Sequence, residues 1–300
     1  MRIAFTLFVS LLAATPLAAS PLEILQSGHP VVEVSLDGSP PRRFVIDTAA
    51  SRTTILPSLR ARMPDLVAEK AERPLNGASG ATEIEMAKVE RLTVDGRDFR
   101  AVQMILLPPS PVDGLGVDGI LGADVIADFA VELDAPGRRW RMAATADVEM
   151  IAGMTASLPF VLDHERAPRL TIKINGVEVP ALLDTGARGT ILNWAAAKKI
   201  GLSADAPGVA AASQVQGAST HGTASAKTRL GRVELGEAAV AAPEVRIADL
   251  PIFKVIGFEA DEPAVILGLD LFAGRRVVID HPGGRLHISD PVVTGAGEAK

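Results

Sequence analysis

The sequence predicts an all-β protein made of two similar lobes. Three features support this prediction: short apolar runs that alternate with polar residues, glycine and proline between the runs, and one long internal repeat. Alternation with period two is typical of strands with one buried face, and glycine and proline mark the turns between them. A chain of 300 residues with 48% hydrophobic residues can also fill two hydrophobic cores.

The internal repeat relates the two halves of the chain. Residues 120–139 match residues 266–285 without a gap at an offset of 146, whereas the Asp-Thr pairs that begin at 47 and 184 lie 137 apart. A repeat of this length is too long for a solenoid unit and indicates a duplicated domain. The expected segments are a signal peptide at 1–20, a first lobe at 21–145, an interlobe linker at 146–157, a second lobe at 158–292 and a flexible tail at 293–300.

The chain begins in the manner of a secretory signal peptide. Met1-Arg2 precedes a largely apolar run over residues 3–12, and small residues follow up to Ala18-Ala19-Ser20. A membrane anchor is the alternative, but the run is shorter than the roughly 20 residues that a span requires, and small residues stand where a signal peptidase cuts. We therefore expect cleavage near Ser20, no stable membrane anchor afterwards, and a periplasmic or secreted protein.

Each half begins with a predicted β-hairpin that ends at an aspartate. Residues 31–46 alternate on both sides of a turn at 37–40 and stop at Asp47, and residues 170–183 do so around Asn175-Gly176 and stop at Asp184. Short helical pieces follow at 57–67 and 193–202, with Ser58 and Asn193 as predicted N-caps. The glycine-rich patches 76–80 and 216–222 then predict flexible hairpin tips.

The two aspartates are the candidate functional residues. An Asp-Thr-Gly after a strand can be an ordinary turn in which Asp bonds its own backbone. The second copy favours a shared role, because two buried strand ends then each deliver one carboxylate. In the first copy the sequence is Asp47-Thr48-Ala49-Ala50, and in the second it is Asp184-Thr185-Gly186-Ala187.

These motifs resemble the retropepsin-like aspartic proteases: an apolar run, Asp-Thr-Gly-Ala, a glycine-rich hairpin, then two apolar residues and Gly. The likeness spans both halves, so the chain resembles a bilobal pepsin-like fold built from two retropepsin-like β-barrel lobes. The resemblance implies catalytic Asp47 and Asp184; dyad support from Thr48, Ala49, Thr185 and Gly186; packing beneath the site by Ile120, Leu121, Gly122, Ile266, Leu267 and Gly268; and substrate-binding flaps at Gly77, Ser79, Gly80, Gly217, Ser219, His221 and Gly222.

The implied chemistry is hydrolysis of a peptide bond by a shared carboxyl pair. Two carboxylates held close together in a partly desolvated cleft share one proton, because both cannot ionise cheaply. One oxygen then deprotonates a water while the other carboxyl protonates the peptide carbonyl. Together with the expected signal peptide, the resemblance thus implies an exported, monomeric aspartic endopeptidase that binds extended peptides and uses no cofactor or metal.

One departure from the family pattern keeps alternatives open. Ala49 stands where the family has Gly; its methyl costs little if φ is negative, but a positive φ would add about 1 kcal/mol or more of strain. A distorted first loop would leave a catalytically impaired pseudoprotease that acts as a peptide-binding module, or a homodimer whose second lobes pair. The chain contains no Tyr, so a pepsin-type flap tyrosine is impossible.

Composition and the remaining motifs argue against other classes. The absence of Cys excludes disulfides, thiolate metal sites and cysteine nucleophiles, and a net charge of −6 without a basic cluster argues against nucleic-acid binding. The five His residues, His29 among them, lack a metal-ligand spacing. The segment 114–119 spells G-x-G-x-x-G but follows a proline-rich stretch and not a strand, which argues against a dinucleotide site.

Two further pairs of repeated aspartates are predicted to have structural roles. Asp124 and Asp270 follow the Leu-Gly pairs, where they are expected to cap short helices. Asp134 and Asp280 precede Pro-Gly turns and are expected to stabilise those turns.

Overall fold

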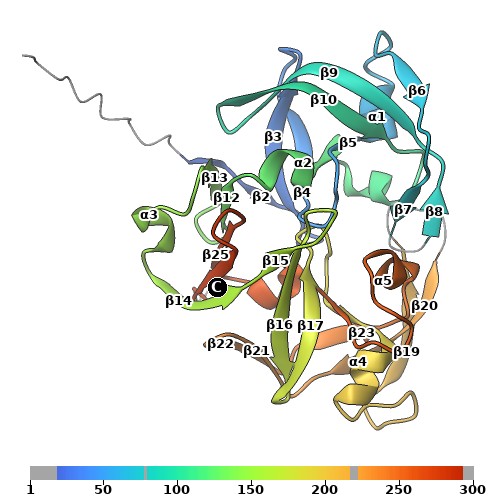
Figure 1. Ribbon diagram of the computed structural model, residues 1–300, viewed down its shortest axis with the longest axis vertical. Helices are drawn as coiled ribbons and strands as arrows, with labels where there is room; N and C mark the ends of the chain where they lie inside the picture. Colours follow the sequence, from blue (N-terminus) through green and yellow to red (C-terminus); the bar gives the residue numbers. More distant parts are fainter. Residues whose placement is uncertain (1–18, 78–79, 217–221, 293–300) are drawn as a thin grey trace, which may run out of the picture.

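The computed structural model describes residues 19–77, 80–216 and 222–292, which form two β-rich lobes (Figure 1). Strand accounts for 46% of the structure and helix for 12%, which confirms the predicted all-β, two-lobed fold. Residues 1–18 of the expected signal peptide and the expected tail at 293–300 lie outside the described residues. Within the described residues, no helix is long and apolar enough to cross a membrane.

The first lobe is an eight-stranded sheet in the order β2-β3-β4-β11-β5-β10-β9-β6, with a separate β7–β8 hairpin. Its elements are β2 (Glu23–Ile24), β3 (Pro30–Leu36), β4 (Arg42–Ile46), β5 (Thr54–Ile55), α1 (Pro57–Arg60), β6 (Ala68–Lys70), β7 (Leu75–Gly77), β8 (Gly80–Thr82), β9 (Glu85–Val94), β10 (Arg97–Leu106), η1 (Pro111–Leu115), β11 (Gly119–Leu121) and α2 (Ala123–Ile126). The alternating burial of β3 matches its alternating sequence, because one face of the strand lies on the core.

The second lobe repeats this plan with β17 and β24 in the places of β4 and β11. Its sheet runs β19-β20-β23-β18-β24-β17-β16-β21-β22, and β15 pairs with β16. The elements are β15 (Val161–Leu162), β16 (Pro168–Ile174), β17 (Val177–Leu183), β18 (Ile191–Leu192), α4 (Trp194–Lys199), β19 (Ala210–Val215), β20 (Thr223–Arg229), β21 (Arg232–Leu235), β22 (Ala238–Ala241), β23 (Glu244–Ile247), α5 (Pro251–Val255), β24 (Val265–Leu267) and η2 (Leu269–Phe272).

A six-stranded sheet joins the two lobes. Its order is β1-β13-β12-β25-β26-β14, and the central pair β12–β25 brings one strand from each half together. The expected interlobe linker, residues 146–157, contains α3 and the first part of β14, which is a strand of this shared sheet. The elements are β1 (Ser20–Pro21), β12 (Ala130–Asp134), β13 (Arg139–Ala143), α3 (Val148–Ile151), β14 (Met154–Pro159), β25 (Arg276–Asp280) and β26 (Arg285–Ser289).

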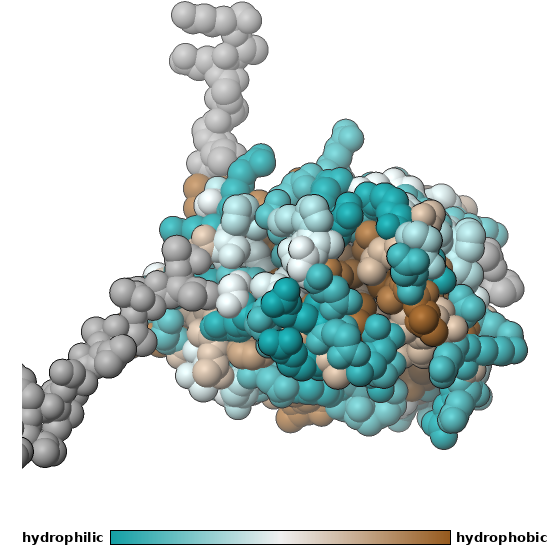
Figure 2. All heavy atoms as spheres, turned by 90° about the horizontal axis from the view of Figure 1, so that it is seen from above, coloured by the Kyte–Doolittle hydropathy of each residue, from teal (hydrophilic) through white to brown (hydrophobic). Residues whose placement is uncertain are grey.

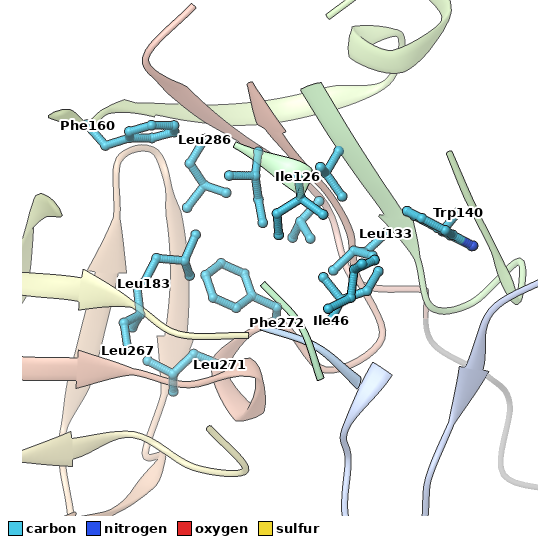
Figure 3. Packing of buried hydrophobic residues seen from close by; sticks show 14 of the residues in the cluster. Ile46, Ile126, Leu133, Trp140, Phe160, Leu183, Leu267, Leu271, Phe272 and Leu286 are labelled. Carbon is cyan, nitrogen blue, oxygen red and sulfur yellow. The ribbon is translucent and has the colours of Figure 1, made fainter. Parts of the chain in front are cut away.

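The largest hydrophobic cluster is continuous through both lobes. Figure 3 shows Ile46 and Leu133 from the first half packed near Phe272 and Leu183 from the second. Hydrophilic residues cover most of the face seen from above, with apolar residues exposed in a smaller area between them (Figure 2). The strands that lead to both aspartates are therefore anchored in one shared core.

The predicted helix caps and turns are partly confirmed. The Asn193 side chain accepts from the Ala196 N–H and caps α4, as predicted. Ser58 is not a cap, because α1 begins one residue earlier at Pro57 and Leu56 occupies the N-cap position. The turn roles of Asp134 and Asp280 are confirmed, since their carboxylates accept from the N–H groups of glycines three residues later.

Candidate active site

Each aspartate stands at the end of a buried central strand. In the first lobe β4 runs parallel to β11, and the Asp47 N–H donates to the Leu121 carbonyl at 3.0 Å. In the second lobe β17 runs parallel to β24, and the Asp184 N–H donates to the Leu267 carbonyl at 3.0 Å. The two acidic loops, residues 47–53 and 184–190, therefore leave their sheets in the same way.

The apolar-apolar-Gly segments pack against these loops. Leu121 and Leu267 are fully buried in the shared core. A Cβ on Gly122 would lie 2.6 Å from the Arg52 carbonyl carbon, and one on Gly268 would lie 2.7 Å from that of Gly189. Only glycine lets the loop backbone pass this closely. Ile120 and Ile266 lie in separate apolar clusters, one in each lobe.

The threonines after the aspartates join the two loops across the lobe boundary. The Thr48 N–H donates to Thr185 Oγ1 at 3.1 Å, and the Thr185 N–H donates to Thr48 Oγ1 at 3.2 Å. The hydroxyls in turn donate to the carbonyls that precede the opposite aspartates, Thr48 to Leu183 and Thr185 to Ile46, each at 2.8 Å. Both threonines are fully buried, so these four bonds hold the loops against each other.

Asp47 and Asp184 are brought together at this junction. Their carboxyl groups hydrogen-bond to each other, and both residues remain partly exposed. Gly186 lies directly against the Asp47 carboxyl, because a Cβ at Gly186 would overlap Asp47 Oδ2. The residues proposed as dyad support thus surround the two acids.

The two carboxyls have different surroundings. Burial raises the pKa of Asp47, while the N–H groups of Ala49 and Ala50 donate to Asp47 Oδ1 at 2.8 and 3.0 Å and oppose that rise. Burial raises the pKa of Asp184 further, and the neighbouring Asp47 charge adds to the effect; the amides of Gly186 and Ala187 offset only part of it.

Hydrogen bonding agrees with this difference. Within the described part of the chain, Asp184 Oδ1 is buried without a hydrogen-bond partner. The Ala187 N–H donates to the main-chain oxygen of Asp184 at 3.2 Å, whereas the corresponding Ala50 N–H donates to a carboxylate. These contacts favour the charged form of Asp47 more than that of Asp184.

Ala49 does not have a positive φ. The backbone at this position suits any residue, so replacing the family's glycine causes no left-handed strain. The corresponding Gly186 also has no positive φ, but it has no room for a methyl group.

Asp124 and Asp270 do not cap helices, which corrects the sequence prediction. Asp124 Oδ1 accepts from both the N–H and the hydroxyl of Thr53 at 2.8 Å, and Asp270 Oδ1 accepts from the Thr190 hydroxyl at 2.8 Å. The N-caps of α2 and η2 are Gly122 and Gly268. The sequence held a signal for these pairs, because both partners are repeated. Thr53 and Thr190 lie 137 residues apart, as the Asp-Thr pairs do, and Asp124 and Asp270 lie 146 apart, as the Leu-Gly segments do.

The flap residues are only partly described. Gly77 and Gly80 face each other at the end of the β7–β8 hairpin, and Gly222 precedes β20 of the second hairpin. Ser79, Gly217, Ser219 and His221 lie outside the described residues. The β7 strand of the first lobe also lies against α5 of the second lobe (Figure 1).

His29 is a neighbour of the site that the sequence analysis set aside. Its ring lies beside the backbone of Gly186 and near Arg188. No motif marks this residue, because it lies far from the second acidic loop in the sequence and reaches it only through the fold.

Two surface cavities lie away from the acidic loops. One of about 500 Å³ is lined by α1, the residues after β8 and the prolines after β10. The other, of about 220 Å³, lies between Asn193 and α5. Neither is lined by Asp47 or Asp184.

A two-lobed β fold with one Asp-Thr loop per lobe is the architecture of the aspartic proteases. A family model described as aspartyl protease matches residues 32–125 and 170–271, which together make up more than half of the chain. The chain therefore belongs to the retropepsin-like aspartyl protease family and carries its domain in tandem. No curated protein matches the chain.

Proposed function

We propose that this protein is an exported aspartic endopeptidase that hydrolyses peptide bonds with a water activated between Asp47 and Asp184. The observation that carries the proposal is the hydrogen-bonded carboxyl pair, held by reciprocal threonine bonds between the lobes. Family membership supports aspartic protease activity in general. Export rests on the pattern of residues 1–20, and N-terminal sequencing of protein recovered outside the cytoplasm tests it.

The environments of the two acids suggest their roles. Asp47 is the ionised partner, because two backbone N–H groups donate to its Oδ1, and it acts as the general base toward water. Asp184 carries the shared proton and donates it toward the oxygen of the peptide carbonyl. The tetrahedral intermediate forms without a covalent bond to the enzyme. When its C–N bond breaks, Asp47 passes the proton taken from water to the leaving amine, and Asp184 recovers its proton from the hydroxyl of the intermediate.

Apolar clusters on both sides of the acids support an extended peptide as substrate. In the second lobe, Val215 and Ile252 pack on the same cluster as Ala49 and Ala187. In the first lobe, Leu75 and Val112 pack on the cluster that Ala50 contacts, together with the partly buried Leu25, Leu115 and Met86. A peptide bound under the glycine-rich hairpins would pair its backbone with strands and place side chains on these clusters.

The proposal is tested with purified mature protein, a mixed peptide library and the variants Asp47→Asn and Asp184→Asn. Each variant keeps the side-chain shape and removes the titratable proton, so we expect cleavage to fall at least about thousandfold with the fold retained. Asp65→Asn, at an exposed position, is the matched control and should cleave as the wild type does. The activity of the wild type should follow a bell-shaped pH profile, since it requires one shared proton.

Two results would contradict the proposal. Cleavage that persists in either variant would exclude a shared carboxyl mechanism. Peptide binding without turnover by the wild type, unchanged in Asp184→Asn, would instead identify a peptide-binding pseudoprotease.

A further inference from the structure

His29 lies in a tight turn between β2 and β3 of the first lobe. The Leu25 N–H donates to the His29 carbonyl at 3.0 Å, and Gly28 takes the positive φ of +90° that the turn requires. Ring atom Nδ1 lies 2.7 Å from Ser27 Oγ, and the ring is partly buried. The turn thus fixes the imidazole at the lobe boundary.

The ring reaches the second acidic loop. There it lies beside the backbone of Gly186, whose carbonyl oxygen is the group to which a ring N–H can donate. If the Ser27 hydroxyl donates to Nδ1, a neutral ring has its N–H at Nε2, where it can donate to Gly186. Burial lowers the pKa of His29, the contact with Gly186 opposes this shift, and nearby Arg188 favours it.

Gly186 lies between this imidazole and the Asp47 carboxyl. A methyl on Gly186 would overlap Asp47 Oδ2, so the backbone is in close contact with that acid. The Gly186 amide also lowers the pKa of Asp184. A displacement of this one peptide unit would therefore change the surroundings of both acids.

The second lobe contains the same turn without the imidazole. The Asp163 N–H donates to the Ala167 carbonyl at 3.0 Å, and Arg166 has the positive φ of 68°, as Gly28 has in the first turn. Ala167 thus corresponds to His29, and it lies in the apolar cluster that Ala49 contacts. The duplicated site is therefore asymmetric. Ala167 occurs with Ala49 on one side, and His29 occurs with Gly186 on the other.

We propose that His29 is a positioning residue of the proposed protease: from the first lobe it holds the Gly186 backbone against the Asp47 carboxyl and fixes how the two acids face each other. This inference rests on the proposed function. It assigns a role in the reaction to a residue outside both Asp-Thr motifs.

The test compares His29→Leu, which removes both ring nitrogens, with His29→Gln, which keeps a donor at the distance of Nε2. We expect His29→Leu to lower kcat roughly ten- to hundredfold per folded molecule with little change in KM, because small misplacement of reacting groups is costly. His29→Gln should recover most of the lost kcat. His164→Leu makes the same change at an exposed histidine in the corresponding turn of the second lobe and should leave kcat unchanged.

Each outcome decides the matter. A purely structural role would lower the melting temperature of His29→Leu but leave kcat per folded molecule at the wild-type value, and that result would overturn the positioning role while the proposed function stands. A wild-type chain that cleaves no peptide would overturn the proposed function and, with it, the role of His29.

Discussion

The residues Asp47 and Asp184 occupy equivalent positions but carry different hydrogen bonds. Two amides donate to Asp47 Oδ1, whereas Asp184 Oδ1 has no partner within the described residues. The residues that follow the paired threonines also differ by one methyl group, present on Ala49 and absent on Gly186. Gly186 lies against the carboxyl of Asp47 with no space for a Cβ. Substitution between alanine and glycine should therefore have different effects at positions 49 and 186.

Gly186→Ala should abolish most activity, whereas Ala49→Gly should be tolerated. The added methyl of Gly186→Ala overlaps Asp47 Oδ2 and must displace a carboxyl, so we expect kcat/KM to fall at least about a hundredfold. Ala49 already has a backbone conformation that suits any residue, so Ala49→Gly should change kcat/KM by no more than a few-fold. Equal effects of the two substitutions would contradict the asymmetric site.

At the scale of the elements, the two acidic loops act as one unit. Each loop follows a central strand and packs against a buried Leu-Gly segment. Each also contains a threonine whose hydroxyl donates to an aspartate, Thr53 to Asp124 in the first lobe and Thr190 to Asp270 in the second. The reciprocal bonds of Thr48 and Thr185 then connect the loops, because each hydroxyl accepts from a backbone N–H of the opposite lobe and donates to a backbone carbonyl of that same lobe.

Thr185→Val should weaken the whole protein. The hydroxyl accepts from the Thr48 N–H and donates to the Ile46 carbonyl, and valine of nearly the same shape leaves both groups buried and unpaired. We expect a loss of roughly 2 to 5 kcal/mol in the free energy of unfolding, measured by urea denaturation. Thr185→Ser keeps the hydroxyl and is the control; a valine variant as stable as the serine variant would show that these bonds contribute little.

For the whole molecule, the shared sheet and the contacts beside it hold the lobes in register. Glu132 of β12 accepts from Arg141 of β13 at 2.6 Å and from Arg276 of β25 at 2.5 Å, and it is almost fully buried. Beside this sheet His281 Nδ1 lies 2.7 Å from the Phe129 carbonyl of the first half, and its ring meets Phe160 edge to face.

His281 should make the fold less stable in acid. Burial lowers the pKa of His281 to about 4 from 6.5, and the charge of Arg166 acts in the same direction. The Phe129 carbonyl and the charges of Asp280 and Asp128 oppose this shift. Because the unfolded chain binds the proton more readily, stability is lost as the pH falls from about 6.5 to about 4, by on the order of 3 kcal/mol.

Melting temperatures of the wild type and His281→Asn at pH 7 and pH 4 measure this effect. The asparagine amide can replace Nδ1 toward Phe129 and does not titrate, so the variant should lose less stability between the two pH values. The raised pKa values of Asp47 and Asp184 act in the opposite direction, but they are common to both proteins and cancel in the comparison. Equal losses would exclude His281 as the source.

Local sequence patterns were sufficient for the strands, the duplication and the two acids. The apolar run before Asp184 and the Asn-Gly turn predict a hairpin because alternation and turn chemistry act over a few neighbouring residues. The roles of Asp124 and Asp270 were predicted wrongly, since a carboxylate beside a helix start can bond that helix or another loop, and only packing selects Thr53 and Thr190.

The sequence by itself determined that two similar β lobes each present an Asp-Thr loop, because the repeat of strand patterns and turn residues is a property of neighbouring positions. The tertiary structure alone decided the contact of His29 with Gly186, the unequal surroundings of the two carboxyls and the sheet that joins the lobes. The contact of His29 with Gly186 and the pairing of β12 with β25 join residues more than 100 positions apart, which meet only after both lobes have packed around their common core.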